Sequence, residues 1–305
     1  MEQVGKLTYA QFCVLVGRIE DRSATLDGIS LREGVPAAEL ERAEKSLVEE
    51  GMLDSRGQVT LSGERALEPY RARRAVLLAS GFGSRMLPIT INTPKPLVRV
   101  KGRRIIESLL DALVAIDIEE IYIVVGYLGE QFELLKRDYP NITIVYNPVY
   151  DTTNNISSAT AVKDHFQNCY AFESDLYLEN PALIRKYRYR SGYVGVPVQS
   201  TPDWCFDVED GVIRDLHKGG TACYHMFGIS YWSAEDGEKL ACDLPAMFER
   251  EECRQRFWDD VPCVLCQDHY QLGIIPCTFD DISEIDSLEE LQEIDSAYRF
   301  ERQSE

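Results

Sequence analysis

Apolar positions recur at two different spacings along the chain, and the change falls near Arg71–Arg74. Before it, Leu7–Ile19 and Ala37–Leu53 carry apolar residues every three to four positions, which predicts amphipathic helices. After it, short apolar runs alternate with segments of helical spacing, which predicts strands separated by helices. The chain is therefore expected to form two domains, a small one over residues 1–73 and a larger one over residues 74–305.

The larger domain is expected to be a doubly wound α/β fold. The predicted strands are Ala75–Ala79, Ile121–Val125 and Ile142–Tyr146, and helices predicted over Ile105–Ile116 and Glu130–Tyr139 separate them. Strands joined by helices of this length form βαβ units, so the sheet should be mostly parallel and covered on both faces. Ligands of such sheets bind beyond the carboxyl ends of the strands, where we expect the functional residues.

The smaller domain resembles a winged helix-turn-helix. Pro36 is typical of a helix start and Gly51 of a helix end. Gln58–Gly63 is predicted to be a strand and turn, the small wing, and Glu64–Tyr70 a last helix. This resemblance implies DNA binding, with the helix over Ala37–Glu50 in the major groove.

The charge of the chain argues against DNA binding. The formal net charge is −19, of which −2 lies up to Arg74 and −17 beyond it, and such a field repels nucleic-acid backbones. The helix over Ala37–Glu50 itself carries five glutamates against Arg42 and Lys45. We therefore expect the small domain to serve docking or dimerisation, which makes a homo-oligomer possible, and DNA to be an improbable partner.

Composition places the protein among soluble globular proteins. Hydrophobic residues make up 45% and charged residues 27% of the chain, and no stretch approaches the roughly 20 apolar residues of a membrane helix. No basic segment followed by an apolar one opens the chain at Met1, so we expect no membrane association and a cytoplasmic location.

Nine cysteines are scattered along the chain, which favours free thiols over a disulfide framework. Cys263 and Cys266 form the one close pair, with Cys253 upstream and His269 just beyond. These four residues have the chemistry of a zinc site, but no second Cys-x-x-Cys faces them, so plain buried or surface thiols are the favoured interpretation.

The first predicted strand of the larger domain runs into a glycine-bearing turn that is suited to a triphosphate. Gly81 and Gly83 let backbone amides approach an anion, and Arg85 adds a forked cation. Neither a dinucleotide fingerprint nor a P-loop fits the turn. The proline-flanked Lys95 holds a second cation in a stiff loop nearby. The turn and strand end predicted to contact the nucleotide comprise Leu78, Ala79, Ser80, Gly81, Gly83, Ser84 and Arg85.

With both motifs in order, residues 74–300 resemble the nucleotidyltransferase superfamily, whose pattern is a GxGxR turn followed by PKPL. The resemblance implies a doubly wound α/β domain that couples a nucleoside triphosphate to a phosphorylated acceptor and releases pyrophosphate. Ser80 stands where the family usually carries alanine, a small change for a backbone-recognition turn. Arg85 would hold the β and γ phosphates, and Lys95 would stabilise the transition state between the α-phosphate and the acceptor.

Two aspartates are the expected ligands of a magnesium ion. Asp175 ends the apolar run Cys169–Asp175, and Asp286 precedes a helix opened by a capping box of Ser287 and Glu290. Mg²⁺ prefers hard oxygen ligands and often takes one or two carboxylates besides the substrate phosphates. From the residues alone, a strand-end turn and a dipole-favoured helix start are the structural alternatives. The family resemblance favours metal ligation by both.

The second half of the larger domain is rich in aromatic residues and resembles the bacterial CTP:phosphocholine cytidylyltransferases. That resemblance rests on Val125–Phe132, Asn147–Asn155, the Trp204 segment and Phe257–Asp259. It implies that Asn155 and Ser158 lie near the nucleotide. It also implies that Trp204, Trp258 and Asp259 form a choline pocket, in which aromatic faces and an acid bind a quaternary ammonium group.

The expected reaction is therefore the magnesium-dependent transfer of CMP from CTP to phosphocholine, giving CDP-choline and pyrophosphate. No general base is required because a phosphate acceptor is already ionised, so the four histidines are expected to be structural or exposed. The alternative acceptors are 2-aminoethylphosphonate, phosphoethanolamine and sugar 1-phosphates. A primary ammonium group would favour more carboxylates and fewer aromatic faces. The non-enzyme alternative is a metabolite-sensing transcription regulator, against which the intact Arg85, Lys95, Asp175 and Asp286 speak.

Overall fold

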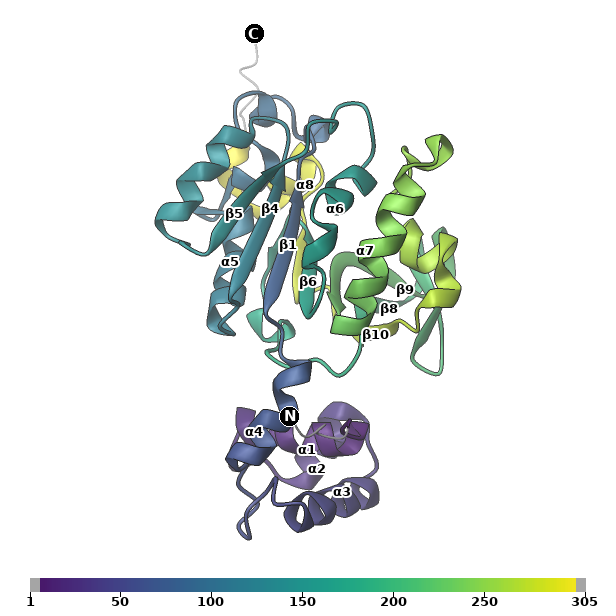
Figure 1. The fold of residues 1–305 in the computed structure, drawn as a ribbon. Coiled ribbons are helices and arrows are strands. Elements are labelled where there is room, and N and C mark those ends of the chain that lie inside the picture. The colour runs from purple at the N-terminus through teal and green to yellow at the C-terminus, as the bar shows by residue number, and fades with distance from the viewer. Residues whose placement is uncertain (1–5, 300–305) are drawn as a thin grey trace. The chain divides into compact units, whose positions relative to one another are not determined.

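The computed structural model describes residues 6–299, so the outermost residues of both predicted domains lie outside the described part. The chain forms two compact units. The first contains residues up to Arg71 together with Tyr187–Tyr189, and the second contains Ala72–Lys186 and the residues from Arg190 onward. The four helices of the first unit are α1 (Tyr9–Glu20), α2 (Leu26–Glu33), α3 (Ala37–Glu49) and α4 (Leu61–Leu67) (Figure 1).

The helices of the first unit begin where their capping residues stand. Thr8 and Gln11 form a capping box at α1, and Pro36 precedes α3 as the sequence predicts. The strand expected over Gln58–Gly63 is wrong in its second half, because Thr60 caps α4 with its hydroxyl and the helix begins at Leu61. A single bridge between Leu53 and Val59 stands in place of the wing, and the winged-helix prediction is not confirmed.

A short segment from the second half of the sequence completes the core of the first unit. Tyr187 and Tyr189 belong to the same hydrophobic cluster as Phe12 and Tyr70. The Tyr189 ring stacks on Tyr70 with centroids 5.4 Å apart, and its hydroxyl donates a hydrogen bond to the Leu7 carbonyl. The first unit is therefore built from two separate stretches of the chain.

The second unit is built on a seven-stranded mixed sheet in the order β10-β8-β9-β6-β1-β4-β5. Strands β6, β1, β4 and β5 run parallel to one another, whereas β9 runs antiparallel to β6 and β8. Two short pairs, β2 with β3 and β7 with β11, lie outside it. The strands are β1 (Arg74–Ala79), β2 (Arg99–Val100), β3 (Arg103–Arg104), β4 (Glu120–Val125), β5 (Ile142–Tyr146), β6 (Cys169–Glu173), β7 (Leu176–Leu178), β8 (Gly192–Glu209), β9 (Val212–Trp232), β10 (Gly273–Pro276) and β11 (Ile282–Glu284).

Helices cover both faces of this sheet, as Figure 1 shows. Because successive strand residues point to opposite faces, Leu77 packs in one core with the helix α5 (Ile105–Ala115) and Val76 in another. The second core includes α6 (Ile156–Ala161) and α7 (Ala234–Phe248). The mostly parallel α/β fold predicted from the sequence is confirmed in this unit.

One predicted helix has a different form. Gly129–Arg137 folds as consecutive 3-10 turns where an α-helix is expected over Glu130–Tyr139. Its buried Phe132 and Leu135 stand three positions apart, which matches three residues per turn. The apolar spacing in this segment therefore favours the tighter helix.

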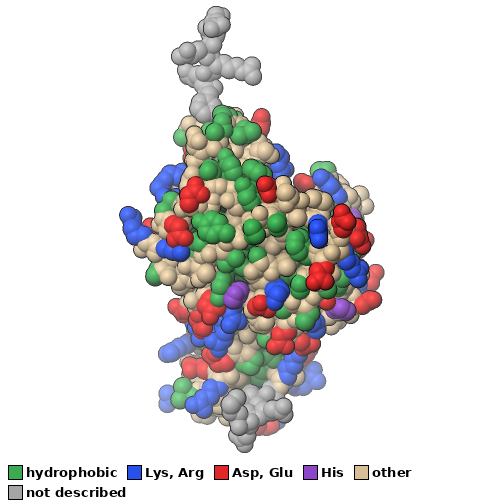
Figure 2. Space-filling model, turned by 45° about the horizontal axis from the view of Figure 1, so that its top comes forward, with side chains coloured by type: hydrophobic (Ala, Val, Ile, Leu, Met, Phe, Trp, Pro, Cys, Tyr) green, Lys and Arg blue, Asp and Glu red, His purple; other side chains and the backbone are tan. Residues whose placement is uncertain are grey.

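Charged side chains are intermingled on the surface. On the face shown in Figure 2, the Lys and Arg side chains of the described residues lie among Asp and Glu and form no continuous basic patch. Within residues 6–299, none of the helices is both long enough and apolar enough to span a membrane.

Candidate active site

The turn after β1 forms one wall of a cavity of about 340 Å³. Gly83 in this turn has a φ of +63°, a conformation that favours glycine. A Cβ on Gly83 would also lie only 2.9 Å from the Cβ of Lys95. Glycine at this position therefore lets the turn and the Lys95 loop approach each other.

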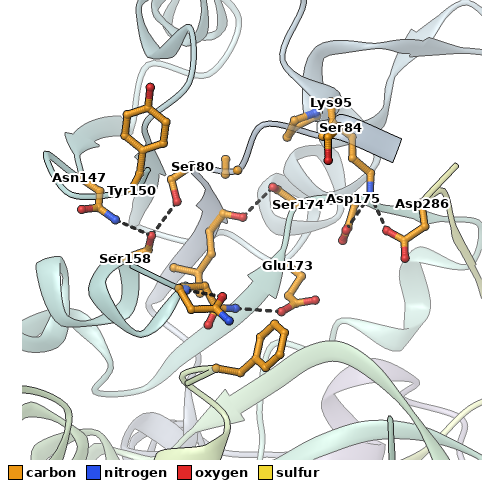
Figure 3. Close-up of a pocket in the computed structure, with 18 of the residues that line it drawn as sticks. Ser80, Ser84, Lys95, Asn147, Tyr150, Ser158, Glu173, Ser174, Asp175 and Asp286 are labelled. Carbon is orange, nitrogen blue, oxygen red and sulfur yellow. Dashed lines mark hydrogen bonds and ion pairs between the residues drawn. The ribbon is translucent and has the colours of Figure 1, made fainter. Parts of the chain in front are cut away.

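The Lys95 side chain reaches into this cavity and joins two aspartates. Its ammonium group lies 2.9 Å from Asp175 Oδ2 and 2.7 Å from Asp286 Oδ1 (Figure 3). Lys95 begins a short 3-10 turn between Pro94 and Pro96 and is only 8% exposed. The guanidinium group of Arg85, which is more exposed, lies 2.8 Å from Asp286 Oδ2. Two cations thus meet the carboxylates that the sequence predicts as metal ligands.

Pairing of two short strands brings the two aspartates together across more than a hundred residues. Asp175 lies in the turn between β6 and β7, two residues beyond the end of β6, and Asp286 follows β11. In the β7–β11 pair Leu176 lies opposite Glu284, and the Ile285 amide donates to the Asp175 carbonyl. The predicted capping box of Ser287 and Glu290 opens the helix α8 (Leu288–Ile294).

A third carboxylate that the sequence analysis did not single out stands beside these two. Carboxylate oxygens of Asp175, Glu284 and Asp286 all lie within 4.8 Å of one another. Asp175 Oδ1 is buried and has no hydrogen-bond partner within the described part of the chain. Hard oxygen donors with an unpartnered buried oxygen among them fit a magnesium ion. Glu284 ends β11 only two positions before Asp286, and this short spacing in the sequence is the signal that could have identified it.

The charges of this cluster shift the pKa values of its members in opposite directions. Burial opposes the charge of Lys95, but Asp175 and Asp286 outweigh it and raise the lysine pKa. Burial likewise opposes the charge of Asp286, but Lys95 and Arg85 lower its pKa. Burial, with Asp175 and Asp286 next to it, raises the pKa of Glu284 to about 8. The cluster therefore holds more carboxylate than its two cations neutralise.

The opposite end of the cavity is lined by hydroxyl and amide groups. Ser158 joins Ser80 at 2.7 Å and accepts from the Asn147 amide at 3.0 Å (Figure 3). The Asn155 amide donates to Glu173, and its oxygen accepts from the Trp258 backbone. The structure brings together every residue expected at the nucleotide or metal, namely Leu78, Ala79, Ser80, Gly81, Gly83, Ser84, Arg85, Lys95, Asn155, Ser158, Asp175 and Asp286. The same wall also includes residues that were not predicted, namely Asn147, Tyr150, Thr153, Asn154, Glu173 and Phe257.

A second, smaller pocket of about 80 Å³ shares Glu173 and Phe257 with the first. Trp204 and Asp259 line it as predicted. The Trp204 ring meets Phe257 edge to face, with centroids 5.6 Å apart. His225, expected to be structural, also lines this pocket and lies 3.1 Å from the Thr201 hydroxyl.

Trp258, predicted at the acceptor pocket, is not among the described residues that line the second pocket. Trp258 is 3% exposed and packs in the core against Phe166, Tyr193 and Trp232. Its neighbour Phe257 lines both pockets instead. Burial of a large indole in an aromatic cluster contributes more to stability than a place at a pocket edge. Core packing is also the commoner use of tryptophan.

The second pocket is strongly acidic. Five carboxylates line it, and none of its described lining residues is Lys or Arg; the five are Glu173, Asp203, Asp259, Asp260 and Glu284. Burial raises the pKa of Asp259 to about 7 even though its carboxylate accepts a hydrogen bond from the Tyr193 hydroxyl. Burial and the charges of Asp175 and Asp259 also raise the pKa of Glu173. Each raised pKa means that the charged form of the carboxyl group is disfavoured here, and a bound cation would stabilise that charged form.

Known proteins match a large part of the chain. Residues 74–189 match the family model described as nucleotidyl transferase. A 2-aminoethylphosphonate cytidylyltransferase from Lancefieldella rimae is 39% identical over 233 residues, which cover 74% of this chain and 93% of that protein. A choline-phosphate cytidylyltransferase from Streptococcus pneumoniae is 33% identical over 190 residues, 62% of this chain and 82% of that protein. The solved CTP:phosphocholine cytidylyltransferase from Streptococcus pneumoniae superposes with a TM-score of 0.69 at 30% identity, covering 74% of this chain and all of that one.

Proposed function

The chain belongs to the nucleotidyltransferase family, among its cytidylyltransferases, and on that premise we propose that it transfers CMP from CTP to 2-aminoethylphosphonate. An oxygen of the acceptor phosphonate forms a bond to the α-phosphorus of CTP, and the bond from that phosphorus to the bridging oxygen of pyrophosphate breaks. The acceptor oxygen is ionised at neutral pH, so no side chain has to remove a proton.

The choice of acceptor depends on the acidic lining of the second pocket. A primary ammonium group donates three hydrogen bonds and is a compact charge, so it matches several converging carboxylates. A trimethylammonium group donates none and is held mainly by aromatic faces. With Trp258 in the core, Trp204 and Phe257 are the aromatic side chains left at a pocket with five carboxylates. The relative that acts on 2-aminoethylphosphonate, at 39% identity, supports the same choice.

Phosphocholine, the acceptor expected from the sequence, is the second candidate. The edge-to-face contact of Trp204 with Phe257 favours it, because this pair offers an aromatic surface to a cation. The choline-phosphate cytidylyltransferases among the relatives support it as well. The two candidates place the same charge in the same pocket and differ in whether the cation donates hydrogen bonds.

In this proposal the side chains at the first pocket position groups and neutralise charge. Arg85 holds the β and γ phosphates, and Lys95 shares its donors between the α-phosphate and the acceptor oxygen. Asp175 and Asp286, with Glu284 beside them, would hold a Mg²⁺ ion, which when bound would neutralise charge that develops on pyrophosphate. Ser80, Asn155 and Ser158 contact the nucleoside.

Pyrophosphate release from CTP, measured with a panel of acceptors, tests the assignment. We expect kcat/KM to be at least about tenfold higher for 2-aminoethylphosphonate than for phosphocholine, which corresponds to roughly 1.4 kcal/mol. Phosphoethanolamine, with the same ammonium group, should rank between them. A higher value for phosphocholine would transfer the assignment to the second candidate, and turnover with a hexose 1-phosphate alone would refute both.

Controls in the same assay address the nucleotide and the metal. ATP, GTP and UTP replace CTP in one series, and we expect CTP to be preferred. EDTA should abolish turnover and excess Mg²⁺ should restore it, because the three carboxylates repel the phosphates without a divalent ion. Undiminished turnover in EDTA would contradict the metal assignment.

For the first unit we propose docking or self-association rather than DNA binding. Its helix α3 carries glutamates at positions 39, 41, 44 and 49, which would repel a DNA backbone. At low salt we expect the full chain to give no sequence-selective shift of DNA in an electrophoretic assay. A tight and sequence-selective shift would establish a DNA-binding regulator instead.

A further inference from the structure

A cysteine, a histidine and an aspartate meet away from both pockets. Asp243 lies on α7, Cys266 ends the π-helical turn Val261–Leu265, and His269 follows three residues later. One ligand atom of each residue lies within 4.8 Å of the other two. The Asp243 Oδ2 atom is 2.8 Å from His269 Nδ1 and accepts a hydrogen bond of 2.6 Å from the Tyr270 hydroxyl.

We propose that Asp243, Cys266 and His269 form a zinc site. Thiolate, imidazole and carboxylate are the three ligand types that Zn²⁺ takes in proteins, and together they disfavour Mg²⁺ and Ca²⁺, which prefer oxygen alone. Cys266 and His269 are separated by two residues, so one turn of chain presents both. The Tyr270 hydroxyl on Asp243 is the kind of outer contact that orients a ligating carboxylate.

The cluster is largely buried and opens to the surface on one side. Asp243 and Cys266 are 9% and 8% exposed, while His269 stands at the surface and gives the ion access. A bound divalent cation deprotonates a ligating thiol, so the ion would hold Cys266 as the thiolate.

The proposed ligand set differs from the one left open by the sequence, which includes Cys263. That thiol is fully buried elsewhere, beside Tyr193 and Asp259. Asp243 takes its place from a distant helix. Phe257, Asp259 and Asp260 line the acidic pocket, and the segment with Cys266 and His269 follows them in the chain. The ion would therefore link α7 to this segment. Such a metal link would fix the position of that segment, whichever acceptor the enzyme uses.

Cobalt and zinc titration of the full-length chain tests this site. The reduced protein is freed of metal by a chelator, which is then removed, and is kept in excess Mg²⁺ to fill the carboxylate cluster. It is titrated with Co²⁺ and then with Zn²⁺. We expect near-ultraviolet thiolate-to-cobalt absorption that saturates at one equivalent and is displaced by one equivalent of Zn²⁺. Zn²⁺ should also raise the unfolding temperature.

Variants locate the binding. Cys266→Ser should abolish the thiolate absorption, and His269→Ala should weaken Zn²⁺ binding by at least about tenfold. His269→Ala alters an exposed side chain, so it serves if Cys266→Ser fails to fold. Cys242→Ser, at an exposed cysteine next to Asp243, and His217→Ala, in the separate cluster with Asp207 and Asp215, should bind as wild type. Absence of thiolate absorption, its survival in Cys266→Ser, or its loss in His217→Ala would overturn the proposal.

Discussion

Lys95→Ala is expected to lower kcat by about 10²- to 10³-fold, the usual effect of removing one preorganised donor from a transition state. The side chain is nine-tenths buried and its ammonium group contacts both predicted metal ligands. Charge that grows on the phosphates during transfer therefore meets a fixed cation at short range. The rate of pyrophosphate release at saturating CTP and acceptor measures the change in kcat.

A second readout separates catalysis from folding. In the structure Lys95 occupies one oxygen of Asp175 and one of Asp286, so its removal frees these two oxygens. Lys95→Ala should therefore bind Mg²⁺ more tightly than wild type in calorimetry without nucleotide, while turnover collapses. Lys101→Ala is the matched control, because Lys101 is an exposed lysine paired with Glu179. Near-normal kcat in Lys95→Ala would remove this residue from the mechanism.

Local patterns predicted the parallel half of the sheet and the phosphate turn. The apolar runs that become β1, β4 and β5 are short, contiguous and separated by turn residues, and burial on both faces left a clear trace in β1 and β4. The GxGxR turn and the proline-flanked Lys95 were recognisable because each depends on neighbours within a few residues. These parts of the fold and the site are encoded locally.

The acceptor pocket depends on pairings that no local pattern reports. Trp204 and Asp203 come from β8, His225 and Gly228 from β9, and Glu284 from β11. Whether Phe257 or Trp258 faces the pocket depends on how the segment after α7 lies on Tyr193 and Trp232. A sequence pattern does not distinguish two adjacent aromatic residues, so the sequence located the segment but not which of the two rings faces the pocket.

Asp259→Asn should raise the KM of the amine acceptor by about 30-fold or more, with a smaller change in kcat. Removing one member of a buried charge pair costs about 2–5 kcal/mol, and the other carboxylates of the pocket hold the loss to the lower end. Asparagine keeps the shape and can still accept the hydrogen bond of Tyr193. Asp260→Asn is the matched control, since the Arg256 guanidinium group already lies 3.5 Å from that carboxylate. Equal KM changes in both variants would contradict a specific role of Asp259.

The same substitution should stabilise the free enzyme at alkaline pH. The pKa of Asp259 is raised by burial from 3.8 to about 7, so between these values the folded chain keeps a proton that the unfolded chain has released. The free energy of unfolding contributed by this group therefore falls as pH rises through that interval and is lowest above pH 7. Asp259→Asn removes this loss, so its advantage in unfolding temperature over wild type should be larger at pH 8 than at pH 5.

Acceptor binding should change in the opposite sense, because ionisation of Asp259 strengthens its attraction for the ammonium group. The ratio of variant to wild-type KM should therefore increase from pH 6 to pH 8, and a ratio independent of pH would show that Asp259 does not titrate against the acceptor.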